Sequence, residues 1–159
     1  MITTQESAKV SEQLVSMLKL AGFDQVRGDA ISEGLLPRCY ASQVKYESYL
    51  SQFDKEYYSK MDWVICDGRN RMFVEVKSQN SNGSTCDKLF RQVFEASYCL
   101  TTHQCREYAL LTHGCKWETD RGAMRALAGV RYEFDRIQNA YALDINGIIN
   151  LFASKWAPR

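Results

Sequence analysis

The chain has 159 residues, of which 45% are hydrophobic and 25% are charged, and its formal net charge is +1. This length supports one domain, over residues 1–159, that buries about two thirds of the surface of its unfolded chain. The near-neutral charge excludes a protein that coats nucleic acid by electrostatics alone, and no apolar run approaches the ~18 residues of a membrane span, so we expect a cytoplasmic protein without a membrane partner.

The region before residue 60 predicts two helices. Apolar residues at helical spacing predict the first helix, from Gln5 to Leu20. Residues 23–40 contain glycine and proline breakers, and they leave room for one short strand. The apolar residues between Ala41 and Phe53 indicate a second helix.

Residues 61–77 predict a β-hairpin. Two β-rich runs flank the turn sequence DGRN at 67–70, and glycine suits the positive φ of a tight turn. A tip at Gly68 and the next residue sets the register of the two strands. Counting outward from that tip places Asp62 directly across from Glu75.

One face of this hairpin carries charges that suggest chemistry. Carboxylates opposite each other lie about 5 Å apart and repel, and a divalent cation held between hard oxygen ligands removes that repulsion. Lys77 shares a face with Glu75, because side chains two residues apart point the same way in a strand. The other face is apolar, which disfavours an ordinary solvated surface as the alternative; it carries Trp63, Ile65, Met72, Val74 and Val76. Asp62, Glu75 and Lys77 therefore predict a site for metal-assisted phosphodiester hydrolysis.

The remaining elements alternate between helix and strand. The pattern predicts a polar loop from Ser78 to Ser84, a helix from Cys86 to Leu100, a strand from Tyr108 to Thr112, a helix from Glu118 to Ala128, a strand at Tyr141–Leu143 and a helix-like segment from Ile145 to Trp156. This order indicates an α/β fold, or α+β under a stricter label, with a mixed central sheet.

The hairpin residues also carry a family resemblance. Asp62, followed by Glu75-Val76-Lys77, resembles the Asp…(Asp/Glu)-x-Lys signature of the PD-(D/E)XK nuclease superfamily, although Met61 stands where the name-giving proline would be. The following Gly-Ser loop and acidic-Lys pair resemble type II restriction endonuclease-like members. The resemblance spans residues 60–113. It implies a restriction-endonuclease-like core of order αβββαβ, in which the first strand would lie within residues 23–60.

The same resemblance implies a mechanism. Asp62 and Glu75, with the backbone carbonyl of Val76, would hold Mg²⁺, for which Mn²⁺ would substitute. Lys77 would sit against the attacking water or the scissile phosphate. It would either orient that nucleophile or take part in proton transfer.

Further site residues are also candidates. This superfamily often takes a third acidic ligand from its N-terminal helix, where Glu12 is favoured over Glu6. Candidates for DNA contact, or for support of the site, are Gln79, Ser84, Lys88, Arg91 and Gln92. For each of these side chains an ordinary solvated position is the alternative.

The expected function is that of a Mg²⁺-dependent DNA endonuclease without an organic cofactor. A sequence-specific enzyme of restriction or homing type would act on double-stranded DNA. It would act as a homodimer, because two-fold symmetry places two active sites on opposite strands. Two alternatives remain: a structure-specific nuclease such as a Holliday-junction resolvase, and a catalytically silent DNA-binding protein on the same fold.

The six cysteines predict reduced thiols. The chain has no Cys-x-x-Cys spacing, and free cysteine commonly fills a core. Only the segment 99–115 concentrates potential zinc ligands, namely Cys99, His103, Cys105, His113 and Cys115. Structural zinc in this segment stays an alternative.

Overall fold

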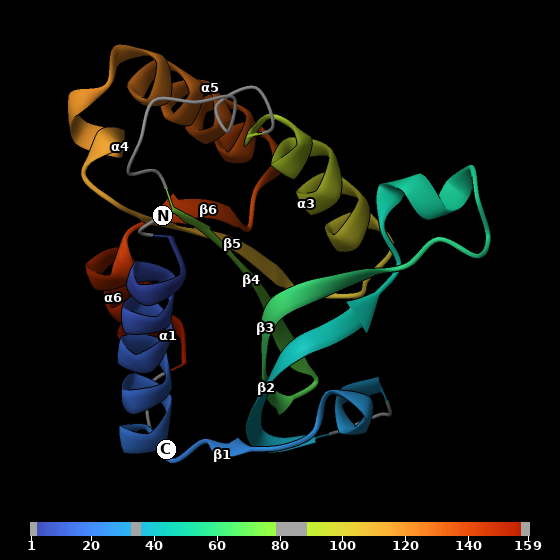
Figure 1. Ribbon diagram of the computed structural model, residues 1–159. Coiled ribbons are helices and arrows are strands. Elements are labelled where there is room, and N and C mark those ends of the chain that lie inside the picture. Colours follow the sequence, from blue (N-terminus) through green and yellow to red (C-terminus); the bar gives the residue numbers. More distant parts are fainter. Residues whose placement is uncertain (1–2, 33–35, 79–88, 157–159) are drawn as a thin grey trace.

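The computed structural model describes residues 3–32, 36–78 and 89–156, which form a mixed sheet between two helical layers (Figure 1). The six strands lie in the order β1-β2-β3-β4-β5-β6. β2, β3 and β4 form an antiparallel meander, whereas β1 runs parallel to β2, and β4, β5 and β6 run parallel to one another. The strands are β1 (Asp24–Gln25), β2 (Leu36–Tyr46), β3 (Ser59–Gly68), β4 (Asn70–Ser78), β5 (Glu107–His113) and β6 (Ala140–Leu143).

Helices cover both faces of this sheet. The α-helices are α1 (Thr3–Leu20), α3 (Arg91–Thr101), α4 (Lys116–Thr119), α5 (Arg121–Ile137) and α6 (Ile145–Lys155), and the 3₁₀ helices are η1 (Gly28–Ser32) and η2 (Tyr49–Gln52). α1 and α6 pack on one face, and α3 and α5 on the other (Figure 1). The prediction of an α/β fold with a mixed sheet between helices is confirmed.

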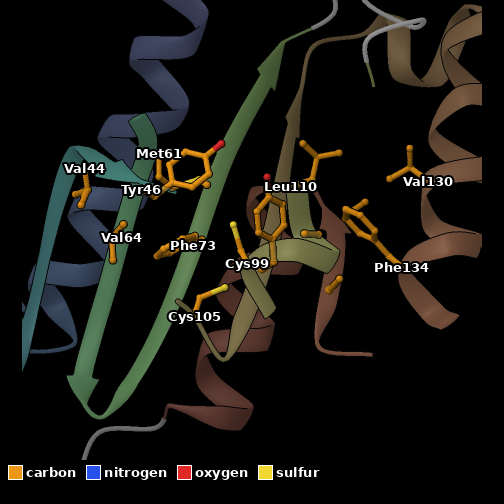
Figure 2. Close-up of a cluster of buried hydrophobic side chains, with 14 of the residues drawn as sticks. Val44, Tyr46, Met61, Val64, Phe73, Cys99, Cys105, Leu110, Val130 and Phe134 are labelled. Atoms are coloured by element: carbon orange, nitrogen blue, oxygen red, sulfur yellow. The ribbon is translucent and has the colours of Figure 1, made fainter. Parts of the chain in front are cut away.

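Each face of the sheet has its own hydrophobic core. On the α3/α5 face, Phe73, Leu110 and Phe134 belong to one buried cluster, part of which Figure 2 shows. On the α1/α6 face, Leu14 and Phe152 pack against the strand residues of a second cluster. Because both faces of the sheet are covered, β5 is buried along almost its whole length, and its centre, residues 108–111, is apolar.

Most predicted helices and strands are present. The first helix is confirmed and begins two residues earlier than predicted, and the strands at 108–112 and 141–143 and the segment from Ile145 are confirmed. The helix predicted at 86–100 corresponds to α3, which begins at Arg91, and the expected start at 86–88 lies outside the described residues. The helix predicted at 118–128 is divided at Asp120, whose side chain accepts a hydrogen bond from the Ala123 N–H at 2.9 Å and so caps α5.

The helix predicted from Ala41 to Phe53 is wrong. This segment contains the second half of β2 and then η2. Ala41 and Val44 are buried in the same cluster although they are three residues apart in a strand. That spacing results from an irregularity at Gln43, whose φ is +52°. The predicted helix combined Val44 of β2 with Tyr49, Leu50 and Phe53, which belong to η2 and its C-terminal cap.

The hairpin register is confirmed from the turn to the middle of the strands. Gly68 has a φ of +67°, Asp67 pairs with Asn70, and Val64 pairs with Phe73. The regular pairs run as far as Trp63 and Val74. Beyond this point β4 continues along β5, whereas β3 bends away together with β2 (Figure 1). Within the described part of the chain, no helix is long and apolar enough to cross a membrane.

Candidate active site

Asp62 lies where β3 and β4 separate, and both of its carboxylate oxygens accept hydrogen bonds. The backbone N–H of Val76 donates to Oδ2 at 2.8 Å, and the Gln43 side chain donates from Nε2 to Oδ1 at 3.2 Å. The side chain is half-buried. Asp62 therefore spans the separation between the two strands, with its carboxylate oriented by one donor from β4 and one from β2.

Glu75 is largely buried, with its side chain 17% exposed. Burial, and after it the negative charge of Asp62, raise the pKa of Glu75 to about 7, although Lys77 and a hydrogen bond from the Asp62 backbone oppose this shift. Lys77 Nζ lies 3.2 Å from Glu75 Oε1, with its side chain 28% exposed. The structure therefore brings Asp62, Glu75 and Lys77 together.

The donor set of this cluster fits a hard divalent cation. Both candidate side-chain ligands are carboxylates, and one ammonium, that of Lys77, faces the two of them. The N–H of Val76 points toward Asp62, and in a β-strand the carbonyl of the same residue points to the same side. The carbonyl of Val76 is thereby directed into the separation between β3 and β4. No group of three or more His, Cys, Asp and Glu side chains with a metal-binding arrangement occurs in the described ranges.

α1 does not bring its predicted acidic ligand to this cluster. A hollow of about 410 Å³ at Asp62, which we call the Asp62 hollow, is lined by Ala8, Ser11, Ser42, Gln43, Asp62, Trp63 and Val76. Glu12 is exposed and lines a different hollow, together with Ile145 and Ile149 of α6. The helix thus turns small residues toward Asp62 and Glu12 away from it. The side chain of Glu6 lies outside the described part of the chain.

The predicted residues of α3 have different surroundings. Gln92 is 7% exposed, and its Oε1 accepts a hydrogen bond from the buried Tyr108 hydroxyl at 2.7 Å, so it joins α3 to β5. Arg91 is exposed and donates to the Tyr57 hydroxyl at 3.1 Å. Gln79, Ser84 and Lys88 lie outside the described residues.

Gln43 was not predicted as a site residue, and it lies 19 positions before its hydrogen-bond partner Asp62. The helix predicted at 41–53 concealed it, because that prediction removed this part of β2 from the sheet. Trp117 was also missed: its indole N–H lies 3.3 Å from the carbonyl oxygen of Lys77 and 3.1 Å from that of His113. It joins the ends of β4 and β5 next to the charged cluster.

The cysteines do not assemble a zinc site in the described region. Cys99 and Cys105 are buried, whereas Cys115 is exposed. Burial raises the pKa of Cys105 to about 12, so its thiol is protonated in the metal-free protein. Cys39 and Cys66 pair across β2 and β3, and burial raises the pKa of Cys66 to about 12. These four buried thiols fill the core.

The chain matches no protein-family model, no curated protein and no solved structure.

Proposed function

We propose that the protein is a metal-dependent DNA endonuclease in which Asp62, Glu75 and Lys77 are the catalytic residues. The observation that carries this proposal is their convergence where β3 and β4 separate, with Glu75 held at a raised pKa beside a second carboxylate. Charged residues on a strand are ordinarily solvated separately from one another. A largely buried carboxylate beside a second carboxylate departs from that arrangement. A shifted carboxyl in such a cluster favours a functional site.

Asp62, Glu75 and the carbonyl of Val76 would hold Mg²⁺ or Mn²⁺. When bound, the cation lowers the pKa of water and neutralises the charge that develops on the phosphate. The hydrogen bond from Val76 to Asp62 keeps one carboxylate oxygen turned toward β4. The second oxygen accepts a hydrogen bond from Gln43, and both of these residues line the Asp62 hollow.

Lys77 would act on the nucleophile or on the phosphate. Its ammonium lies against Glu75. The end of β4 that carries it is held in place because the Lys77 carbonyl accepts a hydrogen bond from the Trp117 indole N–H. From this position it can donate to a phosphate oxygen, or orient the attacking water and move a proton. A cation that neutralises Glu75 would release the ammonium for this task.

The proposed substrate is double-stranded DNA, cut by a homodimer in sequence-specific fashion, as in restriction or homing enzymes. A small domain reads few base pairs alone, so two-fold symmetry would double the site and present both strands to equivalent centres.

Cleavage assays with three substrates test this proposal. The protein would be incubated with Mg²⁺, or with EDTA, and with a plasmid, a genomic DNA library or a synthetic four-way junction. Discrete fragments from duplex DNA are expected. Symmetric cuts in the junction alone would instead indicate a resolvase, and binding without cleavage would indicate a silent DNA-binding protein. Asp62→Asn, purified in the same way, excludes a contaminating nuclease, and Asp67→Asn on the same strand is the matched control.

A further inference from the structure

We propose that Gln43 is a positioning residue that orients the carboxylate of Asp62 for the cation. This inference rests on the proposed function, and it assigns a role in the site to a neutral side chain from β2. Four features of the described residues lead to it: the backbone of Gln43, its place opposite Asp62, its hydrogen bond and its exposure.

The backbone of Gln43 is held in a rarely used conformation. Its φ of +52° lies in the left-handed region, which residues other than glycine seldom adopt and which asparagine adopts more readily than glutamine. Such strain persists only where the surrounding structure imposes it, and it is concentrated at functional sites. An exposed position in a strand gives no packing reason to retain a glutamine here.

The regular alternation of side chains is interrupted in two strands, β2 and β3, at the level of Gln43. Ala41 and Val44 of β2 both point into the α3/α5 core, so the alternation of side chains is reset at Gln43. The same reset occurs in β3, where Met61 and Val64 both point into that core. The pairs Ser42–Trp63 and Val44–Met61 flank this position in the register. Gln43 and Asp62 therefore lie opposite each other. Each is the residue at which the regular alternation of side chains along its strand is interrupted.

This placement lets the Gln43 amide reach the carboxylate. The bond from Gln43 Nε2 to Asp62 Oδ1 complements the bond from Val76 N–H to Oδ2, so the two donors fix the plane of the carboxylate. A neutral donor orients the carboxylate without adding a positive charge that would compete with a cation. Partners of this kind, which orient a metal ligand, set both its geometry and its basicity.

Gln43 can also be replaced without opening a core. It lines the Asp62 hollow on one side, and on the other side it lines a second hollow of about 680 Å³ that η1 borders. A change in its side chain therefore alters the surroundings of Asp62 and the surface of these hollows, and leaves the two hydrophobic clusters intact.

The test uses two substitutions that tolerate positive φ. Gln43→Gly removes the amide, and Gln43→Asn keeps an amide that is one methylene too short to reach Asp62. Gln138→Gly is the matched control, because Gln138 also has a positive φ, of 69°, but lies at the end of α5. For each protein, Mg²⁺ and Ca²⁺ affinity would be measured by calorimetry, and melting would be followed in EDTA and in each metal.

Both Gln43 variants are expected to bind Mg²⁺ about 10–100-fold more weakly than the wild type, as loss of an orienting partner does. In EDTA they are expected to melt no lower than the wild type, because the strain at positive φ is relieved. Gln138→Gly is expected to keep wild-type metal affinity. A purely structural role of Gln43 would give the opposite pattern, with a lower melting point and unchanged affinity.

Two results would overturn the inference, and they are distinguishable. Wild-type metal affinity in both Gln43 variants would reject the role of Gln43 while leaving the proposed nuclease site in place. A wild-type protein that shows no response to Mg²⁺ or Ca²⁺ would reject the metal site itself, and the role of Gln43 with it.

Discussion

The side chain of Asp62 on β3 accepts a hydrogen bond from the backbone N–H of Val76 on β4, at 2.8 Å. The regular pairing of β3 and β4 ends at Trp63 and Val74. Beyond that pair, the Asp62 side chain and not the β3 backbone accepts the hydrogen bond from β4. This link places Asp62 beside Glu75 and keeps one backbone carbonyl, that of Val76, turned toward the same space. The stability and the chemistry of the site are coupled through it, and the following predictions use that coupling.

Divalent cations are expected to raise the melting temperature of the wild type, because a cation bound between Asp62 and Glu75 removes their repulsion. A ligand at 100 times its dissociation constant adds about 2.7 kcal/mol to the free energy of unfolding. Asp62→Asn should melt at least as high as the wild type in EDTA, since it removes a charge beside Glu75, and it should lose most of the gain from Mg²⁺ or Ca²⁺. Thermal scans in EDTA and in each metal measure both effects.

Asp67→Asn is the control for that comparison. Asp67 lies on the same strand, and its carboxylate is 3.5 Å from Arg38, at the opposite end of the hairpin. The substitution removes an equal charge and should keep the full metal response. An unchanged response in Asp62→Asn would show that the cation binds elsewhere.

The pH dependence of stability is expected to report the ionisation of Glu75. Its pKa of about 7 in the folded protein exceeds the ordinary value of 4.5, so the folded state binds the proton more tightly than the unfolded state. The stability associated with this group is therefore full below about pH 4.5 and is lost as the pH rises through about 7. A shift of this size corresponds to about 3 kcal/mol.

Glu75→Gln isolates this contribution. Without metal, the variant should be more stable than the wild type at pH 8, by up to about 3 kcal/mol, and should lose this advantage at pH 4.5. Urea denaturation of both proteins at the two pH values gives the difference in their free energies of unfolding. In this difference, the titration of groups that behave alike in both proteins cancels. Parallel pH profiles for the two proteins would contradict the raised pKa. The variant should also lose Mg²⁺-dependent cleavage.

Lys77→Ala separates a catalytic lysine from a counter-ion. If Lys77 acts on the nucleophile or the phosphate, single-turnover cleavage at saturating Mg²⁺ should fall by about 10²–10⁴-fold while metal binding survives. If it only neutralises Glu75, the variant should lose stability in EDTA and keep its cleavage rate once metal is bound. We expect the first outcome. Lys19→Ala, an exposed position in the last turn of α1, should have neither effect.

Gln92→Leu tests the assignment of Gln92 to the core. The substitution leaves the buried Tyr108 hydroxyl without its acceptor, which should lower the free energy of unfolding by about 1–3 kcal/mol. Metal affinity should stay that of the wild type, because Gln92 binds Tyr108 and not Asp62 or Glu75. Tyr108→Phe together with Gln92→Leu should recover part of the stability, since both polar partners are then absent. A loss of metal affinity with unchanged stability would instead assign Gln92 to the active site.

The elements that the sequence determined by itself are those specified by short-range patterns. The first helix follows from its apolar spacing, and the hairpin register follows from the turn at 67–70, because a tight turn sets the pairing of its own strands. That register is why the sequence alone groups Asp62, Glu75 and Lys77. Two carboxylates near the same turn need no distant contact to become neighbours.

The tertiary structure decided what depends on distant segments or on local strain. The apparent helix from Ala41 to Phe53 combined apolar residues of two elements, the end of β2 and η2, which a periodic pattern does not separate. The partners of the site residues come from β2 and α4, and the burial that raises the pKa of Glu75 depends on the packing of the whole sheet. The rotation of α1 directs Glu12 away from Asp62, and only packing against α6 and the sheet sets that rotation. The spacing of residues along the chain indicates which side chains share a face of a helix or strand. Which other element packs on that face depends on the free energy of packing over the complete chain.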